Sequence, residues 1–209
     1  MHVEFLLEEP SAEETLKTIL PKILSNDVTF DFLVFEGKDD LLNNLPARLN
    51  GYRWIPDDWR IMVLIDEDRR DCYELKAELE RTAREAGFVT KSSALPNSDF
   101  QVVNRLAIEE LEAWFFGDIE ALYAAYPRIS RNLHAKAKFR NPDAVPGGTS
   151  EALERLLKQK NYYTPKERLR KPEIAQNIAP HMEPNRNKSK SFQVFVEGLK
   201  ACVEEKLLV

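Results

Sequence analysis

Apolar segments and amphipathic segments alternate through the first half of the chain. Four apolar runs are typical of strands: residues 3–7, 28–35, 61–65 and 101–108. Three segments place apolar residues at helical spacing: 11–24, 37–49 and 73–86. The run IMVLI at 61–65 has no polar residue, which is typical of a central strand covered on both faces. This alternation predicts an α/β fold with a mainly parallel central sheet and helices on both faces.

Local signals refine the ends of these elements. Ser11 and Glu14 have the spacing of a capping box, so a helix should start there. Pro46 should break or bend the helix over 37–49, and Gly87 suits the position just after a helix. Residues 88–92 predict a further, weak strand, and a helix should follow the last apolar run directly, over 109–118.

The second half of the chain is different in character. Residues 141–150 have the Pro, Gly and Asn content of a loop, and Thr149 or Ser150 can cap a helix over 151–160. The segment 161–190 is polar, basic and interrupted by prolines. Ser191 can cap a last helix, whose apolar stripe we expect to pack into the core. We therefore expect an α/β domain over 1–127 and a basic helical extension over 128–209 packed on it.

Composition narrows the class of protein. The 209 residues are 43% hydrophobic and 31% charged, as in a globular protein. There is no apolar run long enough for a transmembrane helix, and the first residues lack the basic flank of a signal peptide. Two distant cysteines exclude a disulfide framework, and the two cysteines and three scattered histidines do not have the spacing of a zinc motif. A cytoplasmic location without membrane contact fits best.

Charge is unevenly distributed along the chain. Residues 1–127 carry 13 Lys and Arg against 26 Asp and Glu, whereas residues 128–190 carry 15 against 6. An acidic part followed by a basic part suggests a metal site next to an anion-binding surface. The alternative is a basic segment that only packs on an acidic domain.

Carboxylates follow three of the predicted strands. They are Glu8 and Glu9 after the first, Asp66, Glu67 and Asp68 after the third, and Glu109, Glu110 and Glu112 after the last. The carboxyl ends of parallel strands meet at one edge of a sheet, so these acids should gather there. Asp66 and Asp68 should point the same way if the chain stays extended. Glu109 and Glu112 should share a helix face.

Crowded carboxylates raise one another's pKa and destabilise a fold, and a divalent cation removes that conflict. Oxygen ligands without His or Cys select Mg²⁺ or Mn²⁺. We therefore predict a metal site whose ligands come from Glu8, Glu9, Asp66, Asp68, Glu109 and Glu110. The alternative for any single acid is a helix cap or a solvated charge, which Glu9 or Glu13 would satisfy near a helix N-terminus.

Five ordered motifs carry a family resemblance: LLEEPSAE, GKDDLLNNLPARL, LIDEDRRDC, RLAIEELEAWFFGD and IAPHMEPNRNKSKSFQVF. A glutamate after the first strand and an Asp-x-Asp pair after a later one resemble the Toprim pattern. The ordered set resembles a bacterial domain-of-unknown-function family of the Toprim-like group and covers most of the chain. The resemblance implies a metal-dependent, nuclease-like fold. It also implies relatives encoded beside AAA or ABC-type ATPases in anti-phage or mobile-element loci.

The resemblance assigns roles to individual residues. Glu8 matches the Toprim glutamate, Asp66 and Asp68 match the pair, and Glu112 matches an acid found before Ala-Trp in related nuclease-like proteins. Toprim usually has glycine after its glutamate, and this chain has Glu9 instead. That extra charge could alter metal binding or shift the ligand role from Glu8 to Glu9.

These observations predict Mg²⁺-dependent phosphodiester hydrolysis, with DNA as the expected substrate. Glu8, Asp66 and Asp68 would hold one ion, and Glu109, Glu110 or Glu112 would supply a ligand to a second. Phosphate contacts would come from five basic residues: Lys38, Arg140, Arg186, Lys188 and Lys190. The alternative is that those side chains form a solvated surface.

Other functions compete with the nuclease. The DED motif also resembles an aspartate phosphatase motif, which Arg70 weakens. A Toprim topoisomerase needs a nucleophilic tyrosine, for which Tyr162 or Tyr163 is available, and a strand-passage domain, which is missing. A non-catalytic regulatory subunit of an ATPase is the non-enzyme alternative. The chain has no Walker motif, so any ATP dependence would come from that partner.

Overall fold

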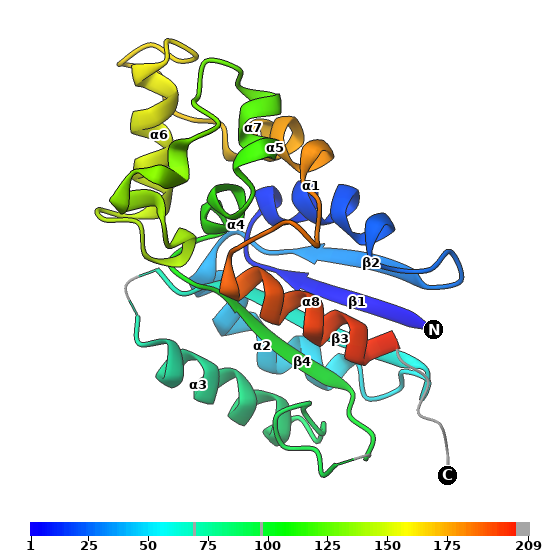
Figure 1. Cartoon of the computed structure of the whole chain (residues 1–209). Helices are drawn as coiled ribbons and strands as arrows, with labels where there is room; N and C mark the ends of the chain where they lie inside the picture. The colour runs from blue at the N-terminus through cyan, green and yellow to red at the C-terminus, as the bar shows by residue number, and fades with distance from the viewer. Residues whose placement is uncertain (69, 97, 204–209) are drawn as a thin grey trace.

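The computed structural model describes residues 1–68, 70–96 and 98–203 and has a four-stranded parallel sheet at its centre (Figure 1). The strands are β1 (His2–Leu7), β2 (Thr29–Val34), β3 (Trp59–Asp66) and β4 (Val102–Ala107), in the order β2-β1-β3-β4. All three pairings are parallel, so the carboxyl ends of the strands lie at one edge. The predicted α/β fold with a parallel sheet is confirmed.

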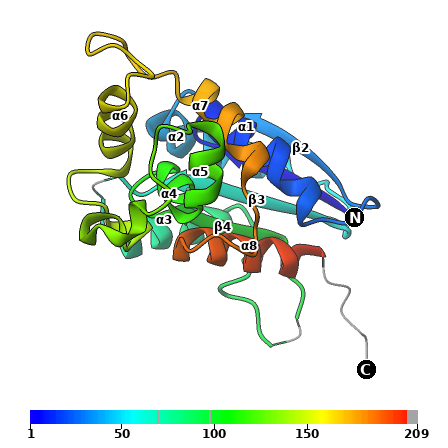
Figure 2. The ribbon, with the colours of Figure 1, turned by 45° about the horizontal axis from the view of Figure 1, so that its top comes forward.

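Helices cover both faces of this sheet (Figure 2). On one face lie α1 (Pro10–Ile19), α7 (Lys171–Ile178) and α8 (Lys190–Val203); α7 packs on α1 and α8 packs on β4. On the other face lie α2 (Lys38–Gly51) and α3 (Cys72–Glu85). Three further helices, α4 (Glu112–Gly117), α5 (Ile119–Ala125) and α6 (Thr149–Gln159), lie beyond the carboxyl edge of the sheet.

The alternation of side chains along β3 divides the core in two. Met62 and Leu64 belong to the larger core on the α1 face, whereas Ile61, Val63 and Ile65 belong to the smaller core on the α2 face. This explains the unbroken apolar run, because both faces of β3 are buried. By the same parity, Asp66 at the end of the strand continues the α1 face.

The second half of the chain belongs to the larger core. Leu153, Ile174, Phe192 and Phe195 are all at most 2% exposed and cluster with side chains of β1. The apolar stripe of the last helix packs into the core as predicted. Basic residues on these helices are therefore held in place by apolar burial, and one of them, Lys171, reaches the acidic edge of the sheet.

The weak strand predicted over 88–92 is wrong, and Pro46 does not break its helix. The segment 88–92 forms only an isolated bridge between Thr90 and Val102. Pro46 lies inside α2 without ending it. Leu41, Leu45 and Leu49 keep one face of that helix buried on the sheet on either side of the proline, and this burial outweighs the lost hydrogen bond.

Helix starts differ from the predictions by one to three residues. Glu9, not Ser11, is the N-cap of α1, and the Ser11 hydroxyl donates a hydrogen bond to the Glu9 carboxylate. Gly148 precedes α6 in place of a Thr or Ser cap. At α8 the hydroxyl of Ser189 accepts from the Phe192 N–H at 3.1 Å, so the cap is not Ser191. Gly87 follows α3 with φ of 91°, as expected.

Candidate active site

Two of the predicted acidic residues lie next to each other where β1 and β3 end. Glu8 follows β1 directly, and Asp66 is the last residue of β3. The backbone N–H of Asp66 donates a hydrogen bond of 2.8 Å to the Glu8 carboxylate. Residues 58 positions apart in the sequence are thus in direct contact because parallel strands end at the same edge.

A lysine that the sequence did not single out stands among the acids. The ammonium group of Lys171, at the start of α7, lies 3.5 Å from a carboxylate oxygen of Glu9, 3.6 Å from one of Glu110 and 3.4 Å from one of Glu112. We call Glu9, Asp66, Glu110 and Glu112 the inner acid cluster. Lys171 reaches it because α7 packs on α1, and no local pattern in a segment already rich in lysine marks that contact.

Two members of the inner acid cluster, Asp66 and Glu112, are buried and have raised pKa values. Glu112 is 3% exposed. Burial raises its pKa to about 7, since the opposing charge of Lys171 only partly compensates and Glu9 and Glu110 raise it further. Burial also raises the pKa of Asp66 well above its ordinary value, and the charges of Glu9, Glu8 and Glu112 act in the same direction. Such perturbed carboxylates are characteristic of functional sites.

The pKa values of Glu8 and Lys171 are also shifted from their ordinary values. Burial raises the pKa of Glu8 to about 7, although the hydrogen bond from Asp66 and the charge of Lys38 oppose this. Burial alone would lower the pKa of Lys171, but the combined charges of its acidic neighbours, Glu112 first, hold it above its ordinary value. Lys171 is therefore a permanent cation within the inner acid cluster.

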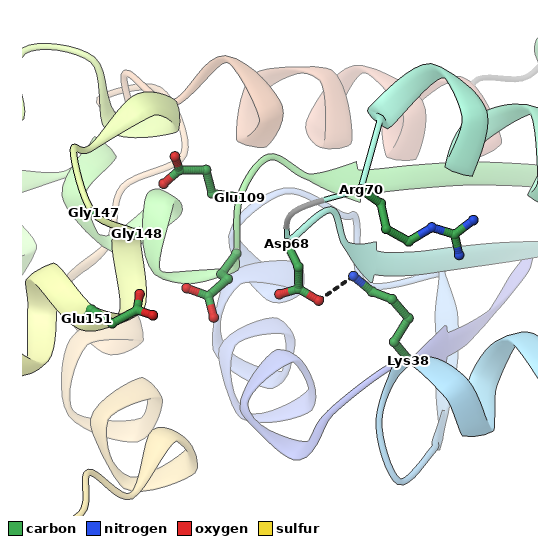
Figure 3. A pocket seen from close by; sticks show the side chains of 8 residues that line it. Lys38, Asp68, Arg70, Glu109, Gly147, Gly148 and Glu151 are labelled. Carbon is green, nitrogen blue, oxygen red and sulfur yellow. Dashed lines mark hydrogen bonds and ion pairs between the residues drawn. The ribbon is translucent and has the colours of Figure 1, made fainter.

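An open cavity of about 640 Å³ lies beside this cluster (Figure 3). Its lining comprises Lys38, Asp68, Arg70, Glu109, Glu110, Gly147, Gly148 and Glu151. Lys38 and Asp68 lie next to each other on one side of it and form an ion pair, whereas the guanidinium of Arg70 extends away to bind Glu78 at 2.7 Å. Gly147 and Gly148 have φ of 81° and 86°, so this turn requires glycine.

Asp68 and Glu109 do not lie as predicted. Asp68 has φ of 53°, so the chain is no longer extended and its exposed side chain leaves the direction of Asp66. Glu109 has φ of 58° and precedes α4, so it shares no helix face with Glu112. Hydrogen bonds connect the two turns. The Asp68 N–H donates to the Glu109 carbonyl at 2.6 Å, and the Glu109 N–H donates to the Glu67 carboxylate at 2.9 Å.

The donor set fits a hard divalent cation in its chemistry. Every candidate ligand is a carboxylate oxygen, and one oxygen each of Glu109 and Glu112 is buried without a hydrogen bond. Within the described ranges, however, the acids of this edge do not bring three ligand atoms within 4.8 Å of one another. Binding would therefore require side-chain rotation around Lys171.

The predicted phosphate-binding residues occupy three places. Arg140, Arg186 and Lys188 line a second cavity of about 200 Å³ beside α4 and α5, where Arg186 binds Asp118 at 2.7 and 2.9 Å. Lys38 lies in the first cavity, and Lys190 lines a third, near β4. The basic loop thus does not act as one continuous strip.

Tyr162, one of the two tyrosines available to a topoisomerase, contacts residues outside the inner acid cluster. The Tyr162 hydroxyl accepts from the Arg128 N–H at 2.7 Å, and its ring packs edge-on against Tyr126. Trp114, Phe115 and Phe116 are at most 2% exposed, so their assignment to the core is confirmed.

No helix among the described residues combines the length and apolar character needed to cross a bilayer.

Comparison with curated proteins found no match. A solved structure of the C-terminal region of the Xanthomonas campestris pv. campestris OLD protein is 12% identical, with a TM-score of 0.46, and the match covers 95% of this chain and 94% of that one. One family pattern, described as a domain of unknown function (DUF4276), matches residues 7–200. The chain belongs to the DUF4276 family.

Proposed function

We propose that this protein is a Mg²⁺- or Mn²⁺-dependent nuclease whose site is the inner acid cluster together with Glu8. The observation that carries the proposal is that carboxylates from the ends of β1 and β3 and from α4 gather around Lys171. Burial raises the pKa values of Glu8, Asp66 and Glu112, a cost that a bound cation would relieve.

The geometry favours Glu9 over Glu8 as the glutamate that faces Asp66. Side chains alternate along β1, so residue 9 continues the α1 face of Val3, Phe5 and Leu7, the face to which Asp66 also belongs. The charge of Glu9 is the largest electrostatic influence on Asp66. Glu8 instead receives the Asp66 N–H and lies within range of Lys38 and Asp68.

We assign the protein's own groups as follows. A bound cation would polarise the phosphate and lower the pKa of a coordinated water. Asp66, Glu9 and Glu112 would hold the ion, and Lys171 would neutralise the remaining acids and face the substrate phosphate. Lys38 donates to Asp68 and to the Glu67 carbonyl, which leaves its third N–H for a phosphate entering the larger cavity.

A cleavage assay tests this proposal. Supercoiled plasmid, single-stranded DNA and RNA would be incubated with the full chain in Mg²⁺, in Mn²⁺ and in EDTA. We expect metal-dependent cleavage that Asp66→Asn and Glu112→Gln abolish. Glu85→Gln makes the same amide change at a side chain that is 72% exposed and should leave cleavage intact. Metal-independent cleavage, or cleavage equal in Asp66→Asn and the unmodified protein, would refute the assignment.

One observation favours a second function, a non-catalytic subunit of an ATPase. Lys171 already supplies a positive charge to the inner acid cluster, so the cluster can persist without metal. Titration calorimetry separates the two functions. Binding of Mn²⁺ that is lost in Asp66→Asn supports the nuclease. No binding of Mg²⁺ or Mn²⁺, no cleavage, and co-purification with an ATPase support the subunit.

A further inference from the structure

A second set of potential ligands lies at the opposite edge of the sheet. One ligand atom each of His2, Glu4 and Asp31 lies within 4.8 Å of the other two. His2 and Glu4 are two residues apart on β1, and their register partners on β2 are Thr29 and Asp31. All four side chains therefore project from the α2 face of the sheet.

This set is far from the candidate active site. His2 begins β1, whereas Glu8 follows its last residue, so the strand separates the two by roughly 20 Å at about 3.3 Å per residue. Figures 1 and 2 show the N-terminus at the end of the sheet away from α4 and α6. A site here has its own ligands and its own chemistry.

The spacing of the donor atoms fits a small transition-metal ion. The Nε2 atom of His2 lies 3.5 Å from a carboxylate oxygen of Glu4. Bonds of about 2.0–2.1 Å at tetrahedral angles place neighbouring ligand atoms roughly 3.3 Å apart. Asp31 is exposed and free to close the remaining distance by rotation.

Neighbouring groups already orient the two buried ligands. The Nδ1 atom of His2 forms a 2.9 Å hydrogen bond with the Thr29 hydroxyl, which leaves Nε2 to face Glu4 and Asp31. The His2 ring packs on Trp59 at 4.0 Å between centroids. The Tyr52 hydroxyl donates a hydrogen bond to the other oxygen of Glu4. Such outer contacts hold metal ligands in place and keep the imidazole in the required tautomer.

The one ion-pair partner of Glu4 among the described residues is His2, which carries a charge only when it is protonated. In the part of the chain that the structure describes, no Lys or Arg forms an ion pair with Glu4 or Asp31. At the carboxyl edge, by contrast, Lys171 forms an ion pair with Glu112 and Lys38 forms one with Asp68. The Glu4 side chain is only 12% exposed, so a missing counter-charge is more costly there than at the surface.

We propose that His2, Glu4 and Asp31 bind one Zn²⁺-class ion, with solvent at the fourth position. One imidazole nitrogen with two carboxylates favours zinc over magnesium, whereas the all-carboxylate inner acid cluster favours magnesium. The protein would thus hold two chemically distinct cation sites at opposite edges of one sheet. The site does not depend on the nuclease assignment.

Calorimetric titration of the tag-free, metal-stripped full chain with ZnCl₂, in buffer that contains millimolar MgCl₂, tests the site. We expect one equivalent of zinc to bind, and Asp31→Asn to weaken binding at least about tenfold. Asp31 is exposed, so this variant should fold, and circular dichroism checks that it does. Asp27→Asn and His181→Asn are matched controls at exposed positions and should bind zinc as the unmodified protein does.

Two further variants decide where the zinc sits. Tyr52→Phe removes the hydrogen bond to Glu4 and should weaken zinc binding by about tenfold. Asp66→Asn should leave it unchanged. Three results would overturn the proposal: no zinc binding by the unmodified protein, the same affinity in Asp31→Asn, or a loss in Asp66→Asn without a loss in Asp31→Asn.

Discussion

Glu112→Gln should stabilise the metal-free protein, because it removes a buried charge that folding disfavours. Glu112 is 3% exposed and one of its oxygens has no hydrogen bond. Its pKa rises from the ordinary 4.5 to about 7 on folding, chiefly through burial. The amide keeps the shape of the side chain and cannot ionise.

The magnitude follows from proton linkage. Between pH 4.5 and about 7 the folded protein holds a proton that the unfolded chain has lost, so stability falls as pH rises. Each pH unit in this interval is worth about 1.4 kcal/mol, so the full penalty above pH 7 is about 3 kcal/mol and is absent below pH 4.5. Glu112→Gln should therefore raise the free energy of unfolding by up to about 3 kcal/mol at pH 8 and by far less at pH 5.

Urea unfolding in EDTA at both pH values measures this difference, with Glu85→Gln as the exposed control. Added Mg²⁺ should then reduce the difference in stability between Glu112→Gln and the unmodified protein at pH 8, because a ligand that binds the folded unmodified protein stabilises it. The reasoning is wrong if Glu112→Gln is no more stable than the unmodified protein at pH 8. It is also wrong if the gain is the same at both pH values, since a pH-independent gain would not come from ionisation.

Three further changes test other contacts. Lys171→Met should lower the free energy of unfolding by about 3 kcal/mol at pH 8 and by less at pH 5, where Asp66 and Glu112 take up protons. Urea unfolding in EDTA measures this, and equal losses at both pH values would contradict it. Asp118→Asn should lower the free energy of unfolding by about 3 kcal/mol in the same assay, because this buried carboxylate caps α5 and binds Arg186 bidentately. An unchanged urea midpoint would argue against this. Gly87→Ala should lower stability by about 1 kcal/mol, since φ is 91°, whereas Gly51→Ala, in ordinary helical geometry, should not.

Hydrophobic patterning alone determined the sheet and most of its helices. The runs at 3–7, 28–35, 61–65 and 101–108 all became parallel strands, with ends within two residues of those predicted. The strands can be recognised because burial on one face requires alternating apolar residues and burial on both faces requires a continuous apolar run. Parallel pairing then places Glu8 beside Asp66, so their proximity follows from topology without any knowledge of side-chain contacts.

Tertiary packing decided which acids are buried together and which charge opposes them. Asp68 and Glu109 adopt left-handed backbone conformations, which turn their side chains away from the expected directions. Neither position is a glycine, so the sequence does not indicate these turns. Lys171 enters the inner acid cluster because α7 packs on α1, an arrangement set by apolar contacts more than 150 residues apart in sequence. Sequence periodicity records burial along one element, but the meeting of two elements depends on how their surfaces fit, and that information lies in the folded structure alone.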